Sequence, residues 1–76
     1  MDELSRQNNL SVIQNTYNKV DPGTKQRMEY ELRRVTHKTQ NDPLTFSEDI
    51  GKLGNNQVHE FMKALRNSSV PFFHAG

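Results

Sequence analysis

Residues 55–66, NNQVHEFMKALR, carry the most regular apolar pattern in this 76-residue chain. Val58, Phe61, Met62 and Leu65 recur at intervals of three and four residues, which places them along one side of a helix. Most of the residues between them are polar or charged, so the opposite side suits water. The stretch therefore predicts a helix that supplies the centre of a hydrophobic core, capped by one of its two leading asparagines.

A short helix is predicted just before this stretch, beginning at Thr45 and ending at Gly54. Thr45 and Glu48 have the spacing of a capping box, in which each side chain bonds the other residue's backbone N–H. The acidic pair Glu48 and Asp49 suits the positive end of the helix dipole. We expect Gly54 to stop this helix in a left-handed conformation.

A longer helix is predicted from Asp21 and Pro22, because aspartate caps helices and proline fits their first turn. It ends near Lys38 or Thr39, ahead of Pro43, since residues before proline avoid helical angles.

The first helix is predicted from Leu10 to Val20, where apolar residues again recur at helical spacing. Residues 1–9 have only Leu4 as an apolar anchor, so we expect a frayed turn or a mobile arm there, and residues 68–76 are expected to form an extended tail. The prediction is one all-α domain over residues 1–76, a compact bundle of three to four short helices. Its expected core comprises Leu10, Ile13, Tyr17, Met28, Leu32, Val35, Phe46, Ile50, Leu53, Val58, Phe61, Met62 and Leu65.

The composition narrows the classes of protein that the chain fits. It contains no cysteine, so disulfides and thiolate metal sites are excluded, and no apolar run has the length of a membrane helix. We expect a cytoplasmic protein that stays off membranes. Hydrophobic residues make up only 32% of the chain, and a core of this size supplies a net stability of only about 3–5 kcal/mol. Self-association or a partner protein is therefore expected.

No catalytic or metal-binding pattern is apparent. His37, His59 and His74 fall on different predicted elements, and the four glycines are too scattered to form a phosphate-binding loop. We expect a protein without enzymatic activity, metal or cofactor.

The helix that begins at Pro22 has an aromatic residue surrounded by cations. Tyr30 lies opposite the apolar stripe, and Arg27, Arg33, Arg34 and His37 stand three, four or seven residues from it. Tyrosine and arginine are common contact residues at protein interfaces, and arginine also pairs with phosphates. Oppositely charged residues four apart on the same helix are equally typical of an ordinary solvated surface. Both interpretations stay open.

The tail contains two adjacent rings, Phe72 and Phe73. They either fold back to complete a thin core or stay exposed to dock into a partner. Neighbouring side chains in an extended stretch point to opposite sides, so one ring can pack into the core while the other stays exposed.

Residues 45–67 combine Ile50 followed by the small Gly51, an asparagine at the turn (Asn55), and Phe61 at a core position of the second helix. This segment resembles the helix-turn-helix family of DNA-binding proteins. It departs from the family's pattern at Leu53, one residue early, and at Asn56, where an apolar residue is usual. An ordinary corner between two helices explains the same residues.

We expect a small regulatory or adaptor protein that binds a protein partner and so inhibits or modulates it. The expected contact residues are Tyr30, Arg27, Arg33, Arg34, His37, Phe72 and Phe73. The alternative is a DNA-binding transcriptional regulator, as the helix-turn-helix resemblance implies. In that case Asn56, Gln57, Glu60 and Lys63 face the major groove, and Arg66 joins Lys63, Arg33 and Arg34 on phosphates.

Overall fold

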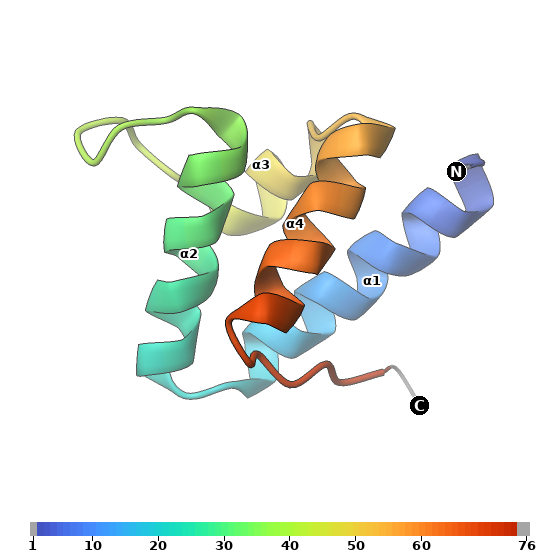
Figure 1. Cartoon of the computed structure of the whole chain (residues 1–76), viewed down its shortest axis with the longest axis horizontal. Helices are drawn as coiled ribbons and strands as arrows, with labels where there is room; N and C mark the ends of the chain where they lie inside the picture. Colours follow the sequence, from blue (N-terminus) through green and yellow to red (C-terminus); the bar gives the residue numbers. More distant parts are fainter. Residues whose placement is uncertain (1, 75–76) are drawn as a thin grey trace.

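The computed structural model describes residues 2–74, which form four helices and no strand (Figure 1). The helices are α1 (Glu3–Lys19), α2 (Pro22–Thr36), α3 (Phe46–Gly51) and α4 (Asn55–Asn67). α4 packs most extensively against α2 and then against α1, while α3 contacts both α1 and α2. A three-residue turn, 52–54, joins α3 to α4 at a corner. The arrangement confirms the predicted all-α bundle.

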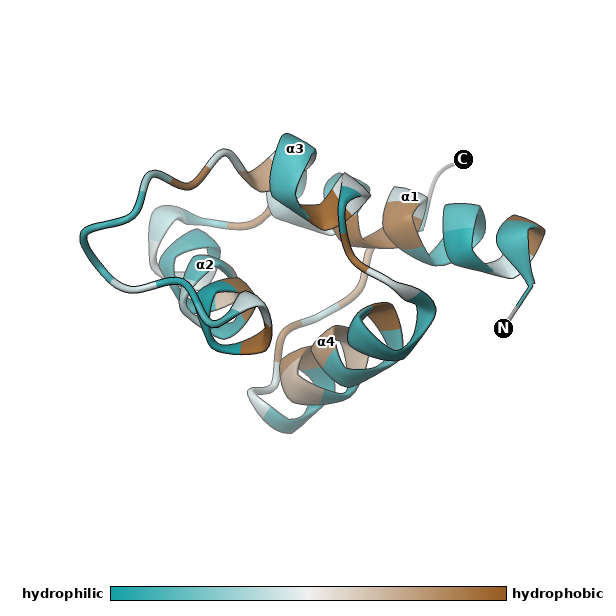
Figure 2. Cartoon of the chain, turned by 90° about the horizontal axis from the view of Figure 1, so that it is seen from above, coloured by the Kyte–Doolittle hydropathy of each residue, from teal (hydrophilic) through white to brown (hydrophobic). Residues whose placement is uncertain are grey.

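The core lies where the apolar residues of the helices meet. The brown ribbon segments in Figure 2 mark hydrophobic residues on the helices and on the segments between them. The stripe on α4 is its centre, since Val58, Phe61 and Leu65 are fully buried. Every residue of the predicted core lies in the buried cluster except Tyr17 and Val35, which are partly buried and pack against it. The tail adds one buried residue, Val70, that the helical pattern does not reveal.

α1 begins seven residues earlier than its apolar pattern predicts, at Glu3. The Asp2 side chain accepts a 2.8 Å hydrogen bond from the backbone N–H of Ser5 and so caps the helix. One turn on, the Arg6 guanidinium donates to the carbonyl oxygens of Gly51 (2.8 Å) and Leu53 (3.0 Å), where α3 ends. Polar contacts, which leave no apolar periodicity, therefore define this end of α1.

α2 begins as predicted and ends slightly early. The Asp21 side chain accepts a 2.9 Å hydrogen bond from the N–H of Thr24, with Pro22 in the first turn. The last helical residue is Thr36, because His37 turns into the left-handed region with φ 63°.

Three predicted features of the α3–α4 corner are wrong. Thr45 makes no side-chain cap; instead its N–H donates to the buried Asp49 carboxylate at 3.1 Å. Gly54 does not stop α3 in a left-handed conformation, since its φ is −73°. It is the N-cap of α4, where its N–H donates to Gln57 Oε1 at 3.0 Å, so neither Asn55 nor Asn56 is the cap.

The described part of the tail, residues 68–74, crosses back over α1. The backbone N–H of Phe73 donates a 2.8 Å hydrogen bond to the hydroxyl of Thr16, which is fully buried. Phe72 is partly buried against the core, beneath the Arg66 guanidinium at 5.7 Å from its ring centroid. Phe73 stays exposed, so one ring packs inward and the other faces out. No helix within residues 2–74 has the length and apolar character needed to cross a membrane.

Candidate functional site

Tyr30 stands on the solvent side of α2 with 54% of its surface exposed. Its position follows from the helix repeat, since Met28 and Leu32 on the opposite side are completely buried in the core. An exposed tyrosine is available as a contact residue, and tyrosine is enriched among the residues that dominate the binding energy of protein interfaces.

Two hollows adjoin Tyr30. One, of about 350 Å³, is lined by Gln26, Glu29, Tyr30, Arg33 and Gln40. The other, of about 280 Å³, is lined by Tyr30, Arg33, Arg34, Lys38, Thr39 and Gln40, and we call it the cationic hollow. The two share Tyr30, Arg33 and Gln40. The ring therefore adjoins both recesses, and the loop after α2 supplies the facing wall.

Hydrogen bonds hold that loop in place. Arg33 Nη1 donates to the carbonyl oxygens of Thr39 and Asp42, the latter at 2.9 Å. The Asp42 carboxylate accepts the N–H of Thr39 at 2.9 Å, and this hydrogen bond lowers the pKa of Asp42. Lys38 Nζ donates to the carbonyl of Pro43 at 2.9 Å. These hydrogen bonds order the wall of the cationic hollow in the free protein.

The acids that pair with two of the lining cations lie deeper than the cations do. Arg34 forms a 2.7 Å ion pair with Glu31, whose side chain is 8% exposed against 59% for the arginine. Hydrogen bonding to Glu31 raises the pKa of Arg34. Lys38 pairs at 3.1 Å with Asp49, which is also buried. The positive ends of both pairs therefore lie toward the surface.

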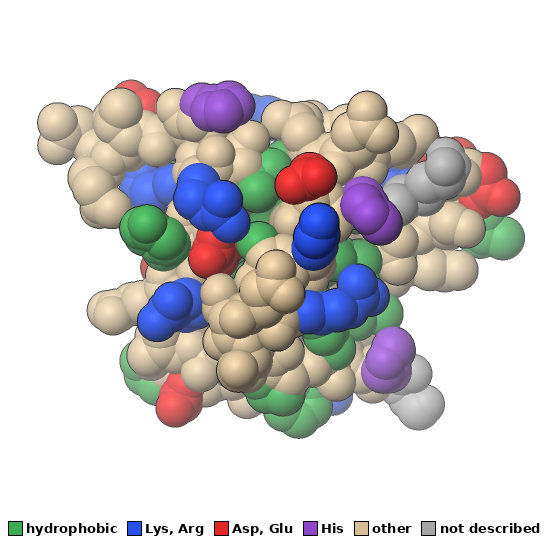
Figure 3. Space-filling view, viewed as in Figure 1, with side chains coloured by type: hydrophobic (Ala, Val, Ile, Leu, Met, Phe, Trp, Pro, Cys, Tyr) green, Lys and Arg blue, Asp and Glu red, His purple; other side chains and the backbone are tan. Residues whose placement is uncertain are grey.

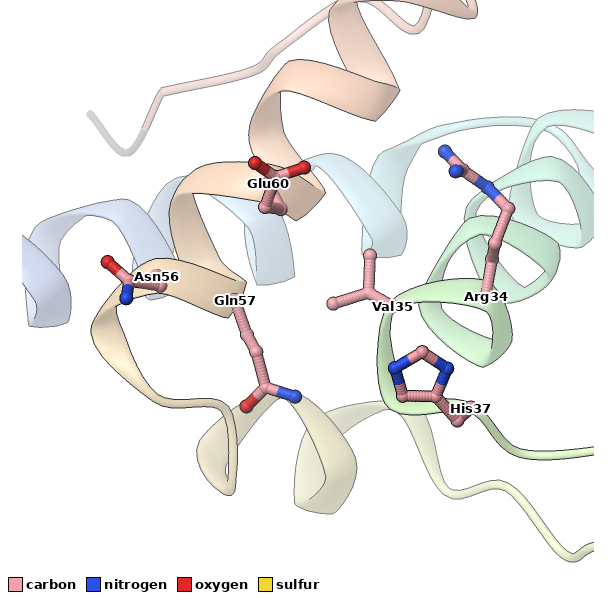
Figure 4. A pocket seen from close by; sticks show the side chains of 6 residues that line it. All are labelled: Arg34, Val35, His37, Asn56, Gln57 and Glu60. Atoms are coloured by element: carbon pink, nitrogen blue, oxygen red, sulfur yellow. The ribbon is translucent and has the colours of Figure 1, made fainter.

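A third recess, of about 310 Å³, lies between the end of α2 and the first turns of α4. Figure 4 shows Asn56, Gln57 and Glu60 of α4 on one side, Arg34 and His37 on the other, and Val35 between them. The structure thus brings Arg34 and His37, which the sequence predicts to contact a protein partner, beside the α4 side chains that it predicts to contact DNA. Arg34 lines both this recess and the cationic hollow, so the recesses follow one another around the exposed side of α2.

The remaining predicted contact residues lie elsewhere. Arg27 and Lys63 are exposed on α2 and α4 and line none of the three recesses. Phe72 and Phe73 on the tail do not line them either. Arg66 lies over the Phe72 ring. Figure 3 shows cationic side chains spread over the face that α2 and α4 form, with acidic ones among them.

Sequence reasoning missed the residues that complete the two hollows beside Tyr30. Gln26 lies one turn before Tyr30, so helical spacing was enough to find it. Lys38, Thr39 and Gln40 follow the end of α2, and no local pattern indicates that they return to the Tyr30 face.

Within the described residues, no group of three or more His, Asp or Glu side chains is placed to bind a metal ion. The chain matches no protein-family model, no curated protein and no solved structure, so the three recesses have to be interpreted from their own chemistry.

Proposed function

We propose that this protein is a small regulatory or adaptor protein that binds a protein partner through the Tyr30 face, meaning Tyr30 and the two hollows beside it. The observation that carries the proposal is an exposed tyrosine bordered by two recesses that share Arg33. Tyrosine and arginine beside pockets are the residues that most often dominate the binding energy of protein interfaces.

The rigidity of the face supports the same proposal. Tyr30 is carried by a helix whose other side is locked in the core, and the opposing loop is held by Arg33 and Lys38. A surface already ordered in the free protein loses little conformational entropy on binding, so more of its contact energy appears as affinity.

Binding to a protein fits this chain better than binding to DNA. Two of the five α4 side chains expected on DNA are engaged within the chain, since Gln57 bonds the cap of α4 and Arg66 covers Phe72. Glu60 adds a negative charge to the same surface of α4, which disfavours phosphates. We include in the proposal a cytoplasmic location, which the absence of cysteine suits, and action without catalysis.

Site-specific photo-crosslinking tests the proposal. A benzophenone amino acid replaces Gln26, which lines a hollow beside Tyr30, and in a second variant it replaces Ser11, which is exposed on α1. In its native cell, the chain labelled at Gln26 should form a discrete protein adduct that the chain labelled at Ser11 does not form. Adding Tyr30→Ala should abolish the adduct.

The opposite pattern would reject the proposal. Identical adducts from both positions, or an adduct that survives Tyr30→Ala, would show that the Tyr30 face is not the interface. Fluorescence anisotropy with a mixed-sequence DNA duplex tests the rival function, since binding to phosphates must weaken steeply as salt rises.

A further inference from the structure

The cationic hollow has an unusual lining. Arg33, Arg34 and Lys38 contribute to its wall, and no carboxylate does. The carboxylates of Glu31 and Asp49 approach two of these cations from the buried side. The Asp42 carboxylate also lies near Lys38 and Arg33, but it accepts the N–H of Thr39 and does not line the hollow. The side chains that line the hollow therefore present cations to a negative group that enters it.

The hollow also has hydrogen-bond donors to spare. Arg33 uses Nη1 for the loop carbonyls, and its Nε and Nη2 have no protein acceptor among the described residues. Lys38 Nζ uses two of its three donors, on Pro43 and Asp49. A carboxylate has two oxygens that accept such donors, and hydrogen bonds between charged partners are stronger than neutral ones.

The charges on either side of the hollow restrict what the rest of the ligand can be. Glu29 lines the neighbouring recess on one side, and Glu60 lines the recess between α2 and α4 on the other. A nucleic acid, with a phosphate at every step, would meet one of these acids as it left the hollow. A peptide with one isolated acidic residue between neutral or basic neighbours is repelled by neither Glu29 nor Glu60.

We infer that the cationic hollow takes an acidic side chain from an otherwise neutral or basic segment of the partner protein, with Tyr30 as one wall. This inference rests on the proposed function and adds the chemical class of the ligand. The shared chemistry is an anionic side chain, supplied by aspartate or glutamate or by a phosphorylated residue.

The test is an NMR titration of the full ¹⁵N-labelled chain with three short synthetic peptides that differ only at a central residue. That residue is glutamate, phosphoserine or glutamine, and its neighbours are glycine and alanine. Glutamate should shift the amide signals of Tyr30, Arg34 and Gln40, and glutamine should not at the same concentration. Tighter binding of phosphoserine than of glutamate supports the same site and identifies a modified residue as the natural source.

Charge changes at Gln40 test the electrostatics without removing a hydrogen bond that holds the loop. Gln40 is exposed on the rim of the hollow. Gln40→Glu should weaken binding of the glutamate peptide about five-fold, and Gln40→Lys should strengthen that binding. The reason is that an exposed charge pair contributes up to about 1 kcal/mol. Ser11→Glu adds the same charge on α1, away from the hollow, and should leave the affinity within about two-fold because salt screens distant charges.

A second pair of variants compares two arginines of α2. Arg33→Gln should weaken binding, whereas Arg27→Gln removes the same charge from the same helix outside the hollow and should not.

Three results would overturn the inference. They are equal shifts from the glutamine peptide, equal losses from Arg27→Gln and Arg33→Gln, and saturation of the hollow by a DNA duplex at lower concentration than by the acidic peptides. Neither of the first two results would contradict a protein adduct that forms at Gln26 and not at Ser11. Failure of the inference is therefore distinguishable from failure of the proposed function.

Discussion

The ring of Tyr17 lies parallel to the ring of Phe46, with an interplanar angle of 5° and 3.8 Å between centroids. Phe46 in turn makes a tilted contact with Phe61 at 6.1 Å, so α1, α3 and α4 meet in one aromatic group. α3 is only six residues long, and a helix of that length is not stable by itself. The aromatic contacts therefore act together with the Lys38–Asp49 ion pair to hold α3, and with it the far end of the loop that walls the cationic hollow.

Replacing Phe46 should unfold much of the protein. Phe46→Ala removes a buried ring and is expected to cost about 3–5 kcal/mol, which is comparable to the whole stability of a domain this small. Far-UV circular dichroism with urea titration measures the effect. Phe46→Leu should retain a folded state, and Ser47→Ala, at the exposed neighbour, should match the parent chain. An unchanged urea midpoint for Phe46→Ala would refute the role assigned to the aromatic group.

The Tyr17 hydroxyl should make stability sensitive to alkali. Burial, together with a 2.5 Å hydrogen bond to Glu29, raises the pKa of Tyr17 from 10.0 to about 12. Because the folded pKa lies above the unfolded one, this group's contribution to stability is complete below pH 10 and is lost as the pH rises toward 12. Tyr17→Phe should remove that part of the alkaline loss, measured as urea midpoints across the range. Parallel pH profiles for the parent and variant would contradict the assignment.

The Asp21 cap should make stability sensitive to acid. Hydrogen bonds from Thr24 lower the pKa of Asp21 below its usual 3.8, so this contribution is present above that pH and is lost as the pH falls through the lower folded value. Asp21→Asn keeps a side-chain oxygen for the cap and should flatten this part of the acid profile while leaving the neutral stability nearly intact. Asp21→Ala should lower the urea midpoint already at neutral pH. A steeper acid profile for Asp21→Asn than for the parent would count against this account.

The bond between the tail and α1 should be detectable residue by residue. Thr16→Val keeps the shape of the side chain but removes the acceptor for the Phe73 N–H, at an expected cost of about 0.5–1.5 kcal/mol. Hydrogen exchange at the Phe73 amide should accelerate. The Val70 amide, which donates to the carbonyl of Leu65 at 3.0 Å, is the internal control and should accelerate less. Equal acceleration at both amides would mean that the whole tail, rather than one bond, depends on Thr16.

The helices and the core were predictable because they depend on local spacing. Val58, Phe61 and Leu65 share one side of α4 whatever surrounds it, and burial of an apolar stripe drives each helix onto the others. Asp21 was predictable for the same reason, since a cap involves only residues three positions apart.

Two departures from the predictions, at Thr45 and at the start of α1, fall where a contact with another element competes with a local rule. Asp49 takes the Thr45 N–H because it is buried and paired with Lys38, and that pair joins the end of α2 to α3. Arg6 helps to hold the first turns of α1 because the end of α3 lies beside them. Neither contact leaves a trace in the spacing of apolar residues.

The amino-acid sequence by itself determined that this chain forms amphipathic helices and that Tyr30 is presented among cations on the outer side of one of them. Only the tertiary structure decided that this side is bordered by recesses. Each recess needs a second wall, supplied by Gln40 from the loop or by Glu60 from α4. Arg33 holds the loop beside Tyr30 through its hydrogen bond to Asp42, and α4 lies beside α2 because their apolar sides pack in the core, and both contacts exist only in the folded protein.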